Sequence, residues 1–328
     1  MTLTTLNPWI AQKHGFDPND RAALEAYQLQ AIRRMVEYAR SRSPFYARLY
    51  EGLPLPDSLA DYARYPSFAA ADWVNRGQQL LCVSQSQIAR IVTLQSSGTT
   101  QAPKRVYFTG ADVALTLDFF QHGMQTICRP GDRALVLFPA RVPDSVGALL
   151  KSALERIGVT VFLAGAEEAP AVVRDKAVTV VCGPPPWLAQ IAAQTPGAAI
   201  RAVLSSSDSL LPSHRARLME SWNCQIFDHY GMTEMGLGGA VECQAHAGMH
   251  IRENDLYLET LAHDGAHLPD GAVGQLVVTT LTRTGMPFLR YRTGDTGCIA
   301  CAPCPCGSSL RRILYVSRMG LGGKRLEP

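Results

Sequence analysis

Long apolar runs, blocks of like charge and a leader-like start are all missing from this sequence of 328 residues. No apolar run reaches about 18 residues, which excludes a membrane-spanning helix of ordinary length. The opening residues, MTLTTLNPWIAQKHGFD, lack a cationic segment followed by an apolar core, so they predict no secretory signal and indicate the cytoplasm. The net charge is only +3 and no lysine or arginine block occurs, so we expect neither nucleic acid nor a membrane as a partner.

Strand-like and helix-like segments alternate through the middle of the chain. Residues 20–50 have apolar residues near helical spacing, with a break and restart at Pro44. The runs ALVLF, VTVFLAG, VTVVCGPP and IRAVLSSS read as buried strands, and helical stretches at 145–157, 186–194 and 212–222 lie between or after them. This rhythm of strand, crossover and strand predicts an α/β fold, with mainly parallel sheets flanked by helices.

The pattern changes after Gly236. LYLETL and GQLVVTTL alternate apolar and polar residues, and Asp-Gly pairs at 264–265 and 270–271 lie between them. Such alternation with tight turns is typical of antiparallel hairpins. We therefore expect a smaller antiparallel β subdomain after the α/β part.

The segment LQSSGTTQAPKRVYFT, residues 94–109, is rich in hydroxyls and is expected between two short strands. Its Gly-Thr-Thr turn and Lys104 could wrap the oxygens of a polyphosphate with hydroxyls, backbone N–H groups and an ammonium. It is not a Walker A loop, because GxxxxGK[ST] is absent. Taken alone, the segment also fits a solvated turn.

Two further stretches carry candidate ligands for a nucleotide. FDHYGMTEMG follows an expected strand and presents Thr233 beside Glu234, a carboxylate suited to Mg²⁺ between protein and phosphate. RYRTGDTG places Asp295 in a glycine-flanked turn, where its oxygens could accept from a ribose diol. Each stretch alone would also fit an ordinary turn.

Together, in this order, the three stretches resemble the adenylate-forming enzyme superfamily. SSGTTQAPK is similar to its phosphate loop, YGMTE to its adenine and Mg²⁺ motif, and YRTGD to its ribose motif. SPFYARLY, ECQAHAGMHI and CPCG resemble segments of the phenylacetate–CoA ligase-like branch, so the similarity runs from about Ser43 to Pro328. The chain departs from the family at Gln101, where a glycine is usual, and at Met319-Gly320, where an Asp pair is usual.

The resemblance implies the domain organisation and the site. Residues 1–75 would be an N-terminal helical segment packed on the core, 76–240 the core that binds nucleotide and acyl group, and 241–317 the β subdomain with a Cys/His metal site. Residues 318–328 would be the hinge region, with the family's small C-terminal domain absent from this chain. That domain supplies the family's adenylation lysine, for which Lys324 is a weak substitute.

Residues matching the motifs take the family's roles. Lys104, Thr233 and Glu234 would be catalytic, and Glu234 would also hold Mg²⁺. The residues expected to bind the nucleotide or border the acyl pocket are Ser96, Ser97, Gly98, Thr99, Thr100, Lys104, Ser206, Ser207, Asp208, Asp228, His229, Tyr230, Gly231, Met232, Thr233, Asp295 and Arg318. The acyl pocket is expected from residues 138–149, 205–210 and 230–237, with Arg141 as a candidate carboxylate partner.

Nine cysteines occur, and four of them lie between residues 298 and 306. In the stretches that resemble the family's zinc-carrying subdomain, Cys243, His250, Cys304 and Cys306 would hold a structural Zn²⁺, with Cys301 and His246 in reserve. An iron–sulfur cluster is the rival, because Cys298, Cys301 and Cys304 follow C-x₂-C-x₂-C spacing. Free thiols are the third interpretation.

The activity implied is that of an AMP-forming acid–CoA ligase. ATP would activate a small carboxylic acid, aromatic or short aliphatic, to an acyl-adenylate, and coenzyme A would accept the acyl group. The alternatives are transfer to a carrier protein or another nucleophile, and a nucleotide-binding module without catalysis. The expected cofactors are ATP/AMP, Mg²⁺, coenzyme A and structural Zn²⁺, and the branch favours a homodimer.

Overall fold

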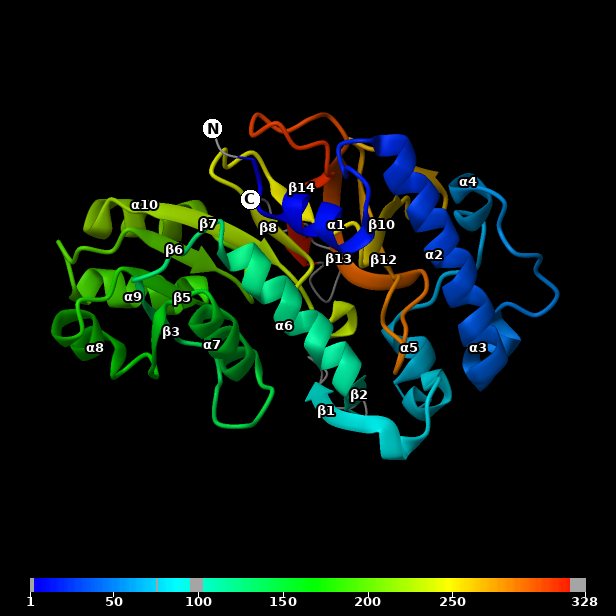
Figure 1. The fold of residues 1–328 in the computed structure, drawn as a ribbon, viewed down its shortest axis with the longest axis horizontal. Coiled ribbons are helices and arrows are strands. Elements are labelled where there is room, and N and C mark those ends of the chain that lie inside the picture. Colours follow the sequence, from blue (N-terminus) through cyan, green and yellow to red (C-terminus); the bar gives the residue numbers. More distant parts are fainter. Residues whose placement is uncertain (1–2, 75, 95–102, 319–328) are drawn as a thin grey trace.

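The computed structural model describes residues 3–74, 76–94 and 103–318. Its main element is a sheet of twelve strands in the order β11-β10-β12-β13-β14-β9-β8-β7-β6-β5-β3-β4, and β1 pairs with β2 in a second, antiparallel sheet (Figure 1). The strands are β1 Ile88–Leu94, β2 Lys104–Thr109, β3 Arg133–Val136, β4 Thr160–Leu163, β5 Val180–Gly183, β6 Ala202–Ser205, β7 Gln225–Tyr230, β8 Ala240–Glu242, β9 Met249–Ile251, β10 Leu256–Leu261, β11 His267–Leu268, β12 Val273–Thr280, β13 Tyr291–Ala300 and β14 Arg312–Arg318.

Helices begin where the sequence offers caps. The Asp20 side chain accepts from the Ala23 N–H at the start of α2, and Ser43 caps α3, whose first residue is Pro44. Pro44 therefore divides the helical stretch at 20–50, as the sequence predicts. The helices are α1 Leu6–His14, α2 Arg21–Arg42, α3 Pro44–Leu49, α4 Leu59–Tyr62, α5 Ala70–Trp73, α6 Gly110–Met124, α7 Val146–Arg156, α8 Ala169–Asp175, α9 Pro185–Gln194 and α10 Pro212–Trp222, with 3₁₀ turns η1 Gly77–Leu80, η2 Gln85–Gln87 and η3 Thr233–Met235.

Strands β3 to β7 are parallel and are covered on both faces. One face packs in a core with α1, α6 and α7, and the other in a core with α8, α9 and α10 (Figure 1). In β3, β5 and β6, burial of both faces explains why the sequence reads as continuous apolar runs. The predicted α/β class is confirmed.

The antiparallel part continues the same sheet. β7 pairs with β8 in the antiparallel sense, and β8 leads through β9 to β14, β13, β12 and β10. A third core packs α2 and α3 against these strands (Figure 1). The change of direction therefore falls beside β7, the strand that leads into YGMTE, so that motif lies where the two parts meet.

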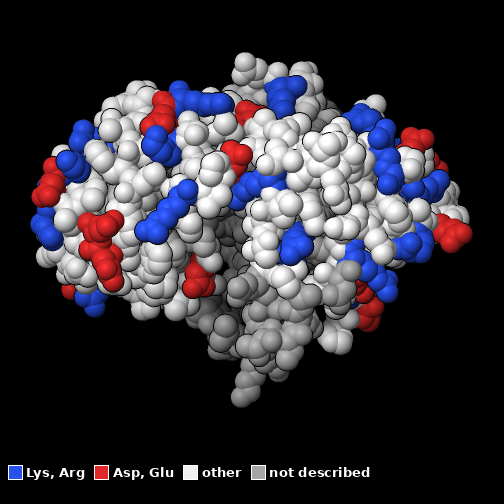
Figure 2. Space-filling model, turned by 90° about the horizontal axis from the view of Figure 1, so that it is seen from below, with Lys and Arg blue, Asp and Glu red and all other residues white. Residues whose placement is uncertain are grey.

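The surface carries charges of both signs. Figure 2 shows lysine and arginine interspersed with aspartate and glutamate over both lobes of the molecule seen from below. Among the described helices, none combines the length and the apolar character needed to cross a bilayer. These observations agree with the small net charge of +3.

Candidate active site

Lys104 and Glu234 meet in the structure, although 130 residues separate them in the chain. Lys104 begins β2 and Glu234 lies in η3, and the ammonium Nζ is 2.9 Å from the carboxylate Oε1. The Tyr291 hydroxyl donates to the same oxygen at 3.2 Å. The Glu234 side chain is only 2% exposed and that of Lys104 19%, so this pair lies at the inner wall of the site.

Two buried arginines hold the turn that carries Glu234. Arg283 donates to the carbonyls of Thr233 at 3.2 Å and Glu234 at 3.0 Å, and Arg252 donates to the carbonyl of Met235. Arg283 also donates to the Tyr107 carbonyl on β2 at 2.8 Å. One guanidinium thus links the strand of Lys104 to the turn of Glu234, because its planar fork can serve several acceptors at once.

Glycine is required at the start of this motif. A Cβ at Gly231 would lie 2.5 Å from the Leu237 carbonyl oxygen and 2.9 Å from the His229 ring atom Cε1. The turn closes at Gly236, whose φ of 84° is unfavourable for other residues. The Gly231 and Gly236 positions therefore allow the backbone to fold tightly around Thr233.

The ribose motif meets the adenine motif through one hydrogen bond. Tyr230 ends β7, and its hydroxyl donates to the Asp295 carboxylate oxygen Oδ2 at 2.9 Å. Burial first, and then the charge of Asp295, raise the pKa of Tyr230 well above its usual value, so it stays a donor. The backbone of Asp295 pairs with that of Arg318 across β13 and β14, which brings the two predicted ribose ligands to one place in the sheet.

An apolar cavity of about 160 Å³ opens beside this turn. Its lining is dominated by aromatic and aliphatic side chains, and the polar ones are Ser206, Ser207, His229 and Thr233. The lining residues are Phe119, Phe120, Gly123, Met124, Phe138, Val146, Leu150, Leu204, Ser206, Ser207, His229, Gly231, Met232, Thr233, Leu237 and Val241. Thr233 is among the lining residues, so the cavity lies directly against the YGMTE turn.

Ser206 and His229 form the polar edge of this cavity. Ser206 directly follows the parallel strand β6, and His229 is the last residue but one of β7. The Ser206 hydroxyl lies 2.8 Å from His229 Nδ1. Burial, with a smaller effect of the Arg252 charge, lowers the pKa of His229 to about 4. The imidazole is therefore neutral at pH 7.

Other predicted residues lie elsewhere. Ser96, Ser97, Gly98, Thr99 and Thr100 fall outside the described residues, as do Gln101, Met319, Gly320 and Lys324. The Asp208 side chain is exposed and accepts from its neighbour, the Ser209 N–H. Asp228 is half-buried beside Glu242, and burial first, then that carboxylate, raise its pKa to about 7. Asp208, Asp228 and the exposed Arg141 do not line the cavity.

Several important side chains carried no signal in the sequence. Phe119 and Phe120 lie in α6, and nothing in their spacing along the sequence places them at the cavity. Arg252 and Arg283 look like ordinary polar residues of the β part, and only the structure shows them buried. A single arginine next to apolar strand residues is too common in protein sequences to identify such a role.

The predicted Cys/His residues converge on one point. One ligand atom from each of Cys243, His250, Cys304 and Cys306 lies within 4.8 Å of the others, and all four residues are buried. Cys243 Sγ is 3.7 Å from Cys304 Sγ, and Cys306 Sγ is 3.6 Å from His250 Nε2. Cys301 is exposed and outside this group, as is His246.

These distances fit a tetrahedral zinc site. Bonds of about 2.3 Å to sulfur and 2.0–2.1 Å to nitrogen give tetrahedral edges of about 3.8 Å between sulfurs and 3.6 Å between sulfur and nitrogen. Three buried thiol groups face one another here, and a bound Zn²⁺ would supply the cation that thiolates need. The donor set therefore fits Zn²⁺ better than the C-x₂-C-x₂-C alternative, which would leave Cys243 and His250 unused.

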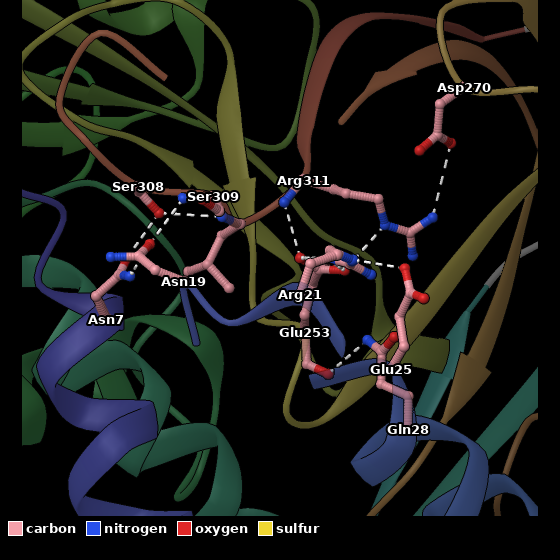
Figure 3. A network of polar contacts seen from close by, with 11 residues as sticks. Asn7, Asn19, Arg21, Glu25, Gln28, Glu253, Asp270, Ser308, Ser309 and Arg311 are labelled. Atoms are coloured by element: carbon pink, nitrogen blue, oxygen red, sulfur yellow. Dashed lines mark hydrogen bonds and ion pairs between the residues drawn. The ribbon is translucent and has the colours of Figure 1, made fainter. Parts of the chain in front are cut away.

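A polar network ties the cysteine loop to the N-terminal helices (Figure 3). The Ser308 hydroxyl donates to Asn7 Oδ1 at 2.6 Å, and the Asn7 amide donates to Asn19 at 2.9 Å. Nearby, the fully buried Glu253 accepts from the backbone and the guanidinium of Arg311, at 2.7 Å and 2.9 Å. The first residues of the chain thus fix the loop that carries Cys304 and Cys306.

The chain is similar to known proteins over most of its length. The family model described as AMP-binding enzyme matches residues 66–282. Phenylacetate-coenzyme A ligases of Aromatoleum evansii and Escherichia coli are each 28% identical to this chain, over 85% of it and 68% of the relative. That of Thermus thermophilus is 28% identical over 89% of this chain and 69% of its own length.

The solved structures agree on the fold. A 2-hydroxyisobutyryl-CoA ligase in complex with 2-HIB-AMP and CoA superposes with a TM-score of 0.81, at 22% identity, over 90% of this chain and 68% of that one. At this identity the likeness shows the fold alone. The resemblance drawn from the sequence motifs is confirmed.

Proposed function

Because the chain belongs to the AMP-binding enzyme family, we propose that it activates a carboxylic acid with ATP and passes the acyl group to coenzyme A. The observation that carries this proposal is the convergence of Lys104, Glu234 and Thr233 beside an apolar cavity. An acid with its body in that cavity would have its carboxylate near Thr233, where the three motifs meet. The matched relatives, named as phenylacetate-coenzyme A ligases, support the same chemistry.

In the first half-reaction, a carboxylate oxygen attacks the α-phosphorus of ATP. A P–O bond to the acid forms as the bond to pyrophosphate breaks, which gives an acyl-adenylate. Lys104 would neutralise phosphate charge, Thr233 would donate to the α-phosphate, and Asp295 would accept from the ribose hydroxyls. Glu234 would hold Mg²⁺, which supplies further charge neutralisation when bound.

In the second half-reaction, the thiol of coenzyme A attacks the acyl carbonyl and AMP leaves. The chain's own contribution is to hold the adenylate, with Tyr230 and Asp295 at the nucleoside and the cavity around the acyl body. A carrier thiol would react in the same way, so direct measurement of coenzyme A consumption separates the two acceptors.

Two measurements test the proposal. Calorimetry asks whether the chain binds AMP and an acyl-sulfamoyl adenosine, a stable mimic of the adenylate, and this needs only the described site. ATP–pyrophosphate exchange across a panel of aromatic and short acids then tests the first half-reaction. Binding of neither adenosine compound, together with no exchange for any acid, would overturn the proposal.

We also propose that Cys243, His250, Cys304 and Cys306 hold one structural Zn²⁺. Four protein ligands leave no open position, so the ion would brace the loop and take no part in the chemistry. Elemental analysis should find about one zinc per chain, and Cys304→Ser should lower both the zinc content and the melting temperature, whereas the exposed Cys301→Ser should change neither. A zinc-free protein with a fully stable Cys304→Ser variant would contradict this. The homodimer and the cytoplasmic location stay predictions.

A further inference from the structure

Gly238 lies where only glycine fits the space. It is buried two residues after η3, and its backbone is not in the left-handed region. Other residues could adopt that backbone conformation, so the requirement for glycine comes from its surroundings. A Cβ at Gly238 would lie 2.5 Å from Phe119 Cε1, 2.7 Å from Phe119 Cδ1 and 3.0 Å from Phe120 Cε1. Two neighbouring phenylalanine rings therefore occupy the space of the missing side chain.

Those two rings are walls of the apolar cavity beside Thr233. Phe119 and Phe120 both line it, whereas Gly238 is outside the lining. Carbon atoms in good contact are about 3.5–4.0 Å apart, so a methyl group at Gly238 would displace the Phe119 ring by roughly 1 Å. Because protein interiors are close-packed, the ring would yield toward empty space, and the adjacent empty space is the cavity. One methyl group behind the wall would thus reduce the room inside it.

Arg252 contacts the same ring. Its guanidinium carbon lies over Phe119, 4.8 Å from the ring centroid, and the residue is only 4% exposed. A guanidinium on an aromatic face attracts it, and more strongly where water is excluded. Arg252 also donates to the Met235 carbonyl of η3, so it joins the cavity wall to the turn that carries Thr233.

We propose that Gly238 sets the size of the acid that this chain accepts, because its missing side chain lets Phe119 and Phe120 stand back from the cavity. Arg252 holds the Phe119 ring in that position. The inference rests on the proposed function and deepens it. Gly238 is then a specificity-determining residue, and Arg252 is a positioning residue that acts through Phe119.

The test compares two adenylate mimics that differ only in the acyl body. Calorimetry measures the Kd of acetyl-sulfamoyl adenosine and of phenylacetyl-sulfamoyl adenosine, with AMP as a ligand that has no acyl body. In the wild-type chain the phenylacetyl mimic should bind at least 10-fold more tightly than the acetyl mimic, because its ring is buried in the cavity. The ratio of these two Kd values reports the room that the cavity offers.

Gly238→Ala should lower this ratio about 10-fold, the usual size of an overpacking effect. The Kd values of AMP and of the acetyl mimic should stay near those of the wild type, which also shows that the variant is folded. Gly165→Ala is the matched control, because Gly165 is exposed, outside the left-handed region and has open space around its Cβ position. It should keep the wild-type ratio.

A smaller side chain at position 119 should cancel the effect. In a Phe119→Leu background, Gly238→Ala should change the ratio by no more than about 3-fold, because only the contact with Phe120 remains. A wild-type or higher ratio in Gly238→Ala, or an equal fall in both backgrounds, would overturn the inference.

Arg252→Lys keeps the charge and removes the planar group that covers the ring, so the ratio should fall partway. Any effect through the Met235 carbonyl would change both Kd values alike and leave the ratio unaltered. Arg311→Lys is the control, since Arg311 is equally buried and lies 5.3 Å from the Tyr257 ring, outside the cavity lining. Equal ratios in Arg252→Lys and the wild type would remove the positioning role.

Failure of this inference is distinguishable from failure of the proposed function. If both mimics and AMP bind and the ratio does not respond to Gly238→Ala, the adenylating function stands and the role of Gly238 fails. If AMP binds and the wild type does not favour the phenylacetyl mimic, the cavity does not hold the acyl body and the inference also fails. If no adenosine compound binds, both fail.

Discussion

Removal of the charges of Lys104 and Glu234, singly and together, should reveal an ion pair that MgATP has to replace. In the structure Lys104 Nζ is 2.9 Å from Glu234 Oε1, yet the proposed function assigns Lys104 to phosphate and Glu234 to Mg²⁺. Binding must therefore exchange one set of contacts for the other. Lys104→Met and Glu234→Gln keep the side-chain length and remove the charges.

The magnitude follows from the distance and the burial. With an effective dielectric constant of about 20, two unit charges at 2.9 Å attract by about 6 kcal/mol. Most of this is offset by desolvation of a carboxylate that is only 2% exposed. Exposed pairs contribute up to about 1 kcal/mol, and breaking fully buried pairs costs about 3–5 kcal/mol, so we expect a coupling free energy of about 2 kcal/mol.

Urea unfolding of the wild type, both single variants and the double variant at pH 7 gives this coupling as a double-mutant cycle. Lys104→Met should lower the free energy of unfolding more than Glu234→Gln, because it leaves a buried carboxylate that still accepts from Tyr291 but has lost the Lys104 cation. Calorimetry with MgATP should show weaker binding in both. A coupling below about 0.5 kcal/mol would refute the reasoning, since the pair would then not exist in solution.

Three further changes test the site. Gly231→Ala would place a Cβ 2.5 Å from a backbone carbonyl and should weaken AMP binding at least 10-fold by calorimetry, with a lower melting temperature. Arg283→Lys keeps the charge but cannot reach all three carbonyls, so MgATP affinity should fall roughly 10-fold, while Arg290→Lys, at a buried pair with Glu259, should lose stability without that fall. Asp228 has a folded pKa raised to about 7, so the folded state binds its proton more tightly than the unfolded state does. Wild-type stability should then decline as pH rises from about 4 to 7, and Asp228→Asn, compared by melting temperature across that range, should remove part of the decline.

Local chemistry made much of the fold predictable. Apolar runs buried on both faces indicated parallel strands, and Pro44 after a capping serine indicated a helix restart. The three motifs and the two Cys/His stretches could also be recognised, because each stretch carries characteristic residue types at short spacing. In the structure Lys104 contacts Glu234, and the four metal-ligand candidates converge at a separate place.

The sequence by itself thus determined the fold class and the family, and it named candidate residues for the nucleotide. The tertiary structure alone decided which distant side chains support them. Arg283 reaches two motifs at once, and Phe119 and His229 share a cavity wall, only because β7 lies where the parallel and antiparallel strands meet. Such contacts depend on the packing of whole elements, and no local pattern in the chain encodes them.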